Sequence, residues 1–162
     1  MLSSEIWLRK NICRKESVSE MTKNFWQTKS LSDFSDDEWE QICCNCGLCC
    51  LVKLQNEEDD EIYYTRIICH LFDQKTRLCK EYKNRCLLVP ECLKVTPENI
   101  DKLEWMPKNC AYRILNETGD LPKWHNLKKE SDNFPKLPEN LIADNLVGEE
   151  NLEDYIVEDD VF

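Results

Sequence analysis

The nine residues from 42 to 50 read Ile-Cys-Cys-Asn-Cys-Gly-Leu-Cys-Cys. This stretch holds five of the chain's 11 cysteines and indicates both its fold and its chemistry. Cys43, Cys46 and Cys49 follow a C-x2-C-x2-C spacing, and Cys50 comes directly after. Two cysteines separated by two residues can direct both sulfur atoms at one ion, because the intervening turn frees backbone N–H groups to point at the thiolates. Gly47 favours this turn, since glycine adopts positive φ at no steric cost. The stretch therefore predicts a cysteine-rich metal-binding knuckle.

The spacing leaves the identity of the metal open between zinc and iron. C-x2-C-x2-C also binds three corners of a cubane iron–sulfur cluster in bacterial-type ferredoxins, with the fourth cysteine elsewhere. Soft thiolates suit zinc and iron–sulfur clusters alike. One structural zinc takes four ligands, and the chain has 11 cysteines. Either two closed sites or one site with spare thiols fits that count.

The phase of the spacing also predicts how neighbouring side chains point. Cys44 lies one residue out of phase with Cys43 and Cys46, so we expect its side chain to point away from the ion. Adjacent cysteines rarely serve one ion comfortably. We therefore expect Cys49 and Cys50 to point to opposite sides of the turn.

The composition excludes some classes of function and indicates the cellular compartment. The 162 residues fit one domain, and 21 Lys+Arg against 32 Asp+Glu give a net charge of −11. This acidity argues against binding to nucleic acid or to an anionic membrane surface, and no apolar run approaches the ~20 residues of a membrane helix. No signal peptide is recognisable, so we expect a cytoplasmic protein whose cysteines bind metal or do redox chemistry.

Charge and cysteine content divide the chain into three parts. Residues 1–24 form a polar extension that is either frayed or, if translation starts at Met21, not translated at all. Residues 25–127 hold every cysteine except Cys13 and form the expected metal-binding domain. Residues 128–162 form an acidic tail with interspersed apolar residues, and we expect short elements in it that pack on the domain.

Local patterns predict an α+β fold with short helices and a small antiparallel sheet. A capping box at 35–38 opens a helix whose Trp39 and Ile42 face inward. Residues 61–69 are rich in β-branched and aromatic residues and predict a strand, which pairs with 51–54 across an acidic turn. A Thr-Pro-Glu start predicts a helix from 96 to about 103. A further short helix over 110–116 ends before Gly119.

No catalytic constellation is visible beside the cysteines. The chain has 3 glycines and 2 histidines, and it contains no phosphate-binding loop and no nucleophile elbow. His70, beside Cys69, is either a metal ligand or a satisfied or solvent-facing residue, and we expect the second. We expect His125 not to be a ligand, and the acidic run 56–61 to be a solvated turn. An enzymatic activity is therefore not supported, although a redox role stays open.

Ordered landmarks along the chain resemble a known family. The pattern of Cys43, Cys46, Cys49 and Cys50 is similar to the signature of the CxxCxxCC cysteine-cluster proteins, described as zinc- or iron-chelating domains. The resemblance is closer to the bacterial YcgN-like branch of that family. It is carried by Phe-Trp at 25–26, Asp-Glu-Trp-Glu at 37–40, Asp-Glu-Ile-Tyr at 60–63, Leu-Glu-Trp-Met-Pro at 103–107, Cys-Ala-Tyr-Arg at 110–113 and Leu-Pro-Lys-Trp-His at 121–125.

The resemblance implies a larger ligand set than the spacing alone. The family pattern retains eight cysteines as metal-binding candidates: Cys43, Cys46, Cys49, Cys50, Cys69, Cys79, Cys92 and Cys110. Cys13, Cys44 and Cys86 are additions in this chain. Cys86 also stands where the wider family often has a proline, which leaves the ligand assignment around Cys86 and Cys92 open.

Three interpretations follow for the function. The metal is a structural zinc in an interaction module, an iron–sulfur centre for electron transfer or redox sensing, or the cofactor of a cluster-dependent enzyme. The cofactor is thus zinc or iron, either mononuclear or in an iron–sulfur cluster. We expect no nucleic-acid or membrane partner, and the sequence leaves a protein partner and the oligomeric state open.

Overall fold

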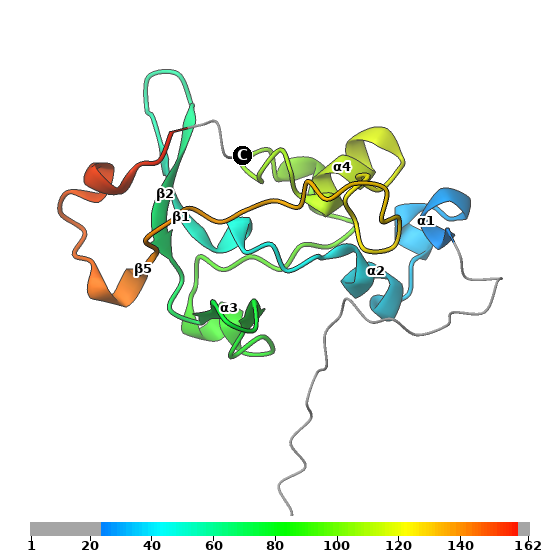
Figure 1. Cartoon of the computed structure of the whole chain (residues 1–162), viewed down its shortest axis with the longest axis horizontal. Helices are drawn as coiled ribbons and strands as arrows, with labels where there is room; N and C mark the ends of the chain where they lie inside the picture. The colour runs from blue at the N-terminus through cyan, green and yellow to red at the C-terminus, as the bar shows by residue number, and fades with distance from the viewer. Residues whose placement is uncertain (1–23, 159–162) are drawn as a thin grey trace, which may run out of the picture.

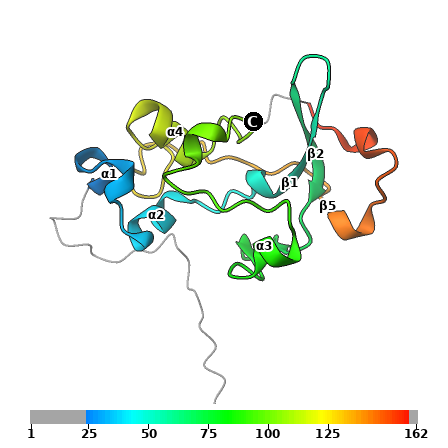
Figure 2. The ribbon, with the colours of Figure 1, turned by 180° about the vertical axis from the view of Figure 1, so that it is seen from behind.

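A computed structural model describes residues 24–158, and three of its helices lie apart from the main sheet (Figure 1). The helices α1, α2 and α4 lie at one end and the strands β1, β2 and β5 at the other, and the reverse view shows the same division (Figure 2). The α-helices are α1 (Phe25–Thr28), α2 (Asp36–Ile42), α3 (Arg85–Leu88) and α4 (Ala111–Thr118). The strands are β1 (Leu51–Gln55), β2 (Ile62–Ile68), β3 (Phe72–Asp73), β4 (Leu78–Cys79) and β5 (Ile142–Ala143). Short 3-10 helices are η2 (Leu31–Asp33), η3 (Leu48–Cys50), η4 (Ile100–Lys102), η5 (Asp144–Leu146) and η6 (Leu152–Tyr155). The α+β class predicted from the sequence is confirmed.

The predicted capping box opens α2. The Ser35 hydroxyl accepts a hydrogen bond from the Glu38 backbone N–H at 3.2 Å, and the Glu38 carboxylate accepts one from the Ser35 N–H at 2.9 Å. These bonds satisfy N–H groups that have no partner within the helix. Trp39 and Ile42 are both buried, as their positions in the pattern predicted.

The main sheet is mixed rather than antiparallel. β1 and β2 pair antiparallel across the exposed acidic turn, as predicted. β5 from the tail then joins β2 in parallel, with Ile142 opposite Ile67 and Ala143 opposite Ile68. The expectation of an antiparallel sheet is therefore wrong at this edge, because the pairing joins segments far apart in the sequence.

The two predicted C-terminal helices have different outcomes. α4 forms and ends at Gly119, whose φ of 74° and N–H bond to the Leu115 carbonyl complete the cap. The helix expected from 96 to about 103 is wrong, since only η4 forms there. Asn99 explains the difference: its side chain accepts from the Thr96 N–H and donates to the Lys94 carbonyl, each at 2.8 Å. Such side-chain bonds to the local backbone compete with a helix.

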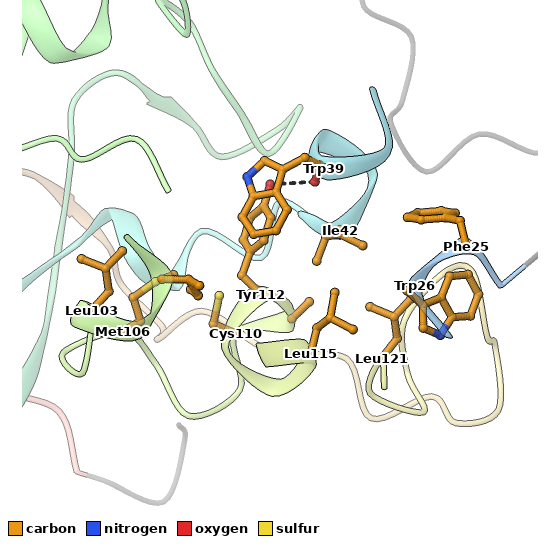
Figure 3. Close-up of a cluster of buried hydrophobic side chains, with 12 residues drawn as sticks. Phe25, Trp26, Trp39, Ile42, Leu103, Met106, Cys110, Tyr112, Leu115 and Leu121 are labelled. Atoms are coloured by element: carbon orange, nitrogen blue, oxygen red, sulfur yellow. Dashed lines mark hydrogen bonds between the residues drawn. The ribbon is translucent and has the colours of Figure 1, made fainter. Parts of the chain in front are cut away.

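Two hydrophobic clusters form the core. The helical cluster is drawn in Figure 3 and consists of Phe25, Trp26, Trp39, Ile42, Ile100, Leu103, Met106, Cys110, Ala111, Tyr112, Leu115 and Leu121. Within it, the Tyr112 hydroxyl donates to the Trp39 carbonyl at 3.0 Å. The sheet cluster consists of Leu48, Leu51, Tyr64, Ile68 and Phe72. The cysteine loop 43–50 runs between the two clusters, because Cys43 packs on the helical cluster whereas Cys46 and Cys50 pack on the sheet cluster.

The C-terminal tail packs on the sheet cluster. Residues 129–138 contain no helix or strand, and β5, η5 and η6 follow. Leu137, Leu141 and Val157 contact the sheet cluster. The polar extension before residue 24, with Cys13 and Met21, lies outside the described residues. No helix within 24–158 is long and apolar enough to cross a membrane.

Candidate metal centre

Two residues with positive φ shape the loop that carries the cysteines. Asn45 has φ 53° and Gly47 has φ 81°. A Cβ atom added at Gly47 would lie 2.6 Å from Cζ of Phe72, so the loop approaches the sheet cluster too closely for any side chain. The prediction that Gly47 supplies a positive φ is confirmed.

Backbone N–H groups point at the sulfur atoms, as the spacing predicted. The Asn45 N–H lies 3.5 Å from Sγ of Cys43. The Leu48 N–H likewise donates to the Cys46 sulfur. This hydrogen bond lowers the pKa of the Cys46 thiol, whereas burial raises it. Each thiol is thus met by the N–H two residues further on. This arrangement stabilises thiolates, the form in which cysteine binds a metal.

Arg77 holds this loop from outside. It lies in the turn between β3 and β4, and its guanidinium donates to the Asn45 carbonyl at 3.2 Å and to the Cys46 carbonyl at 2.6 Å. The same guanidinium lies 5.4 Å from the ring centre of Phe134. It therefore fixes the loop and places a positive charge beside the Cys46 thiol.

The fold brings a remote cysteine to the loop. Cys110 is buried at the N-cap of α4 and interacts electrostatically with Cys43, Cys46 and Cys49. We call these four residues the four-thiol group. Three belong to the C-x2-C-x2-C stretch, and the fourth comes from the helix that closes the helical cluster.

The four-thiol group has the electrostatics of a cation site. Burial raises the pKa of Cys43, and it raises the pKa of Cys46 to about 12 and that of Cys110 to about 11. A negative charge on Cys49 raises all three further. The thiols can therefore ionise together only with a cation among them, because a cation reverses both effects. The donor set fits a soft metal such as zinc or iron.

The thiols are spread more widely than the ligands of one zinc ion. Four sulfur atoms at ~2.3 Å from one zinc lie about 3.8 Å apart in a tetrahedron. Within residues 24–158, three ligand atoms all within 4.8 Å of one another occur only at Cys69, His70 and Asp144. No trio of the four-thiol group is that close, so side-chain rotation would have to draw it together around a single ion.

The vicinal thiols join two groups of cysteines. The Cys49 and Cys50 thiols hydrogen-bond to each other, which lowers the pKa of Cys49 and raises that of Cys50. The expectation that they point to opposite sides of the turn stays a prediction. Cys50 in turn interacts with Cys69 and Cys92, whose pKa values burial also raises, that of Cys92 to about 11.

The remaining cysteines are placed around these groups. Cys79 interacts with Cys69, and the exposed Cys86 interacts with Cys92. The eight cysteines implied by the family resemblance thus fall into the four-thiol group and a second set, which consists of Cys50, Cys69, Cys79 and Cys92. Their role as ligands stays a prediction.

Cys44 and His125 occupy structural positions. The Cys44 thiol accepts a hydrogen bond from the Asn126 amide at 3.7 Å, and the residue is buried. His125 is fully buried, its Nε2 lies 3.1 Å from the Ile42 carbonyl, and its Nδ1 accepts from the Leu127 N–H at 3.1 Å. Both ring nitrogens therefore have protein partners.

Two further basic residues lie near the thiols. Lys53 donates to the Cys49 carbonyl at 3.0 Å, and its ammonium lies 5.2 Å from the ring centre of Trp105. Lys53 and Arg85 add to the Cys50 hydrogen bond in lowering the pKa of Cys49. Together with Arg77 they offset the negative charge that several thiolates around one metal would carry. Sequence reasoning missed all three, because no local pattern connects them to the cysteines.

Comparison with known proteins shows the family of the chain. The CxxCxxCC family model, described as a "putative zinc- or iron-chelating domain", matches residues 42–111. A UPF0260 protein of Pseudomonas fluorescens is 41% identical over 138 residues, covering 82% of this chain and 93% of the relative. The chain belongs to the UPF0260 family. A UPF0260 protein of Caulobacter vibrioides is 54% identical over 105 residues, covering 65% of each chain. No solved structure matches the chain.

The match to the CxxCxxCC family model supports a metal-binding role with zinc or iron. The matched range contains the whole four-thiol group and ends one residue after Cys110. The YcgN-like branch named from the sequence landmarks stays a prediction, because the names of these relatives specify no branch.

Proposed function

We propose that this UPF0260 protein binds one metal centre through Cys43, Cys46, Cys49 and Cys110. The observation that carries the proposal is the convergence of the C-x2-C-x2-C loop with the N-cap of α4. Burial and mutual repulsion keep three of these thiols neutral without a cation. A bound metal would tie the helical cluster to the sheet cluster, since the loop contacts both.

Two observations favour an iron–sulfur cluster over a single zinc ion. The arrangement of three cysteines in one turn with a fourth from elsewhere is the ferredoxin-type pattern. The four thiols are also spread more widely than one zinc requires. A cluster suits this spread because its metal atoms lie between the ligand sulfurs. The function proposed is then electron transfer or redox sensing, and structural zinc is the second candidate.

Purification without oxygen tests both candidates. Iron–sulfur centres are coloured, whereas zinc is d¹⁰ and colourless. We expect brown protein with iron and acid-labile sulfide in equal amounts. Colourless protein with stoichiometric zinc would show that the centre is a structural zinc and not an iron–sulfur cluster. Protein that is folded but holds neither metal after anaerobic loading would overturn the proposal itself.

A further inference from the structure

Three different ligand types meet at the end of β2. The Cys69 sulfur, a ring nitrogen of His70 and a carboxylate oxygen of Asp144 all lie within 4.8 Å of one another. The first two residues follow β2 directly, and the third begins η5 in the tail. None of the three belongs to the four-thiol group, so the site can be judged independently of the proposed function.

Strand pairing places the carboxylate at this point. β5 runs parallel to β2, with Ala143 opposite Ile68, so the next residue on each strand is Asp144 beside Cys69. Oδ1 of Asp144 accepts from the His70 backbone N–H at 2.9 Å and lies 2.7 Å from Nδ1 of its ring. The tail therefore delivers one carboxylate oxygen to a fixed position.

The site is accessible from solvent, and the surroundings of the Cys69 thiol favour a bound cation. The side chains of His70 and Asp144 are 36% and 29% exposed, so an ion can enter from solvent. The Leu71 N–H faces the Cys69 sulfur from two residues further on, as the Asn45 N–H faces Cys43. The Cys69 sulfur and the Asp144 carboxylate also repel each other when both are charged. A divalent cation between them would turn this repulsion into attraction.

We propose that Cys69, His70 and Asp144 form a second metal site that binds Zn²⁺. A set of one sulfur, one imidazole nitrogen and one carboxylate oxygen suits zinc, whose usual ligands include all three types. Three protein ligands leave the fourth tetrahedral position to water or to Cys79, which interacts with Cys69. The zinc would anchor the tail to the sheet.

A hydrogen-bonded His70–Asp144 pair without metal is the competing explanation. Such a pair needs no thiol and stabilises the protein equally with and without zinc. The two explanations therefore differ in the role of Cys69 and in the effect of a chelator.

The test compares the wild-type chain with Asp144→Asn, Cys69→Ser and the control Asp154→Asn, which removes the same charge from the same tail. Each folded protein is loaded with Zn²⁺, freed of excess and analysed for zinc per chain. We expect Asp144→Asn and Cys69→Ser each to hold one zinc fewer than the wild-type chain, and Asp154→Asn to match it. Equal zinc in all four proteins would overturn the proposal.

A second measurement keeps the test valid if Cys69→Ser does not fold. The unfolding midpoint of wild type and Asp144→Asn is measured with Zn²⁺ and with chelator. A ligand that binds the native state raises the midpoint, so we expect a larger zinc-dependent rise in the wild-type chain. A rise of the same size in both would establish the metal-free pair. Cys46→Ser should lose the metal of the four-thiol group and keep this zinc, so the two proposals can fail separately.

Discussion

At the scale of single residues, the spacing of the cysteines predicts more than their number. The loop geometry around Cys43 and Cys46 follows from local rules: positive φ at Gly47 and N–H groups aimed at sulfur. The remote members of the site, such as Cys110 and Arg77, could not be assigned from spacing, because tertiary packing brings them in. Asp144 likewise depends on a parallel strand pairing that no local signal announces.

The difference between Cys44 and Cys46 can be tested directly. Cys46→Ser replaces a thiolate by a hydroxyl that stays protonated at neutral pH and binds zinc or iron poorly. We expect this variant to lose the metal of the four-thiol group. Cys44→Ser should keep it, because the Cys44 sulfur faces Asn126. Metal per chain in anaerobically prepared variants measures the effect, and equal loss in both would contradict the phase of the knuckle.

His125 makes the stability depend on pH in a defined direction. Burial lowers the pKa of His125 below its usual value near 6.5. Below pH ~6.5 the unfolded chain then binds more protons than the folded one, so stability falls as the pH drops, by at most about 1.4 kcal/mol per pH unit.

An NMR titration of the His125 ring checks this prediction directly. The midpoint should lie below that of the same ring in the chain unfolded by urea. A His125 midpoint equal to or above that of the unfolded chain would be inconsistent with the buried neutral ring.

At the scale of elements, local sequence signals predict a helix or strand correctly where the side chains favour the same backbone conformation as the element. The capping box starts α2, a stretch rich in β-branched and aromatic residues forms β2, and Gly119 ends α4. The segment around Asn99 fails because its amide occupies backbone groups that a helix would use. Thr96 therefore precedes only the short 3-10 helix η4, because the Asn99 side chain hydrogen-bonds the backbone on which an α-helix would depend.

The capping box should contribute measurably to stability. Ser35→Ala removes the oxygen that accepts from the Glu38 N–H, and loss of such a cap costs about 1 kcal/mol. We expect a lower unfolding midpoint with unchanged metal content, because α2 leads into the cysteine loop but supplies no ligand before Cys43. Ser32→Ala is a matched control in the preceding η2. Equal unfolding midpoints for the Ser35 and Ser32 variants would show that the cap does not contribute to the free energy of unfolding.

At the scale of the whole molecule, the cysteine loop connects two small cores. A second contact joins the clusters, because the Tyr64 hydroxyl of the sheet cluster donates to the Trp105 carbonyl at 3.2 Å and Trp105 packs on the helical cluster. Neither cluster is large, and small cores are marginally stable alone. The proposed metal therefore acts as a cross-link as well as a redox or structural centre.

Removing the metal should separate the unfolding of the two clusters. Four tryptophans, at 26, 39, 105 and 124, lie in or against the helical cluster, so their fluorescence follows that half. Hydrogen exchange at Ile68 and Tyr64 follows the sheet cluster. With metal bound we expect both probes to report one coincident transition, as a cooperative unit requires.

After chelation under reducing conditions, the thiols regain their protons and the cross-link is lost. We expect the free energy of unfolding to fall by several kcal/mol, because the binding free energy of a structural metal is also folding free energy. The fluorescence and exchange transitions should then diverge, with residues 43–50 exchanging fastest. Asp144→Asn treated in the same way controls for loss of the second zinc, since it removes that site alone. Coincident transitions and an unchanged midpoint after complete metal removal would show that the two cores hold together by packing, and the cysteine loop would then be a ligand site without a structural role.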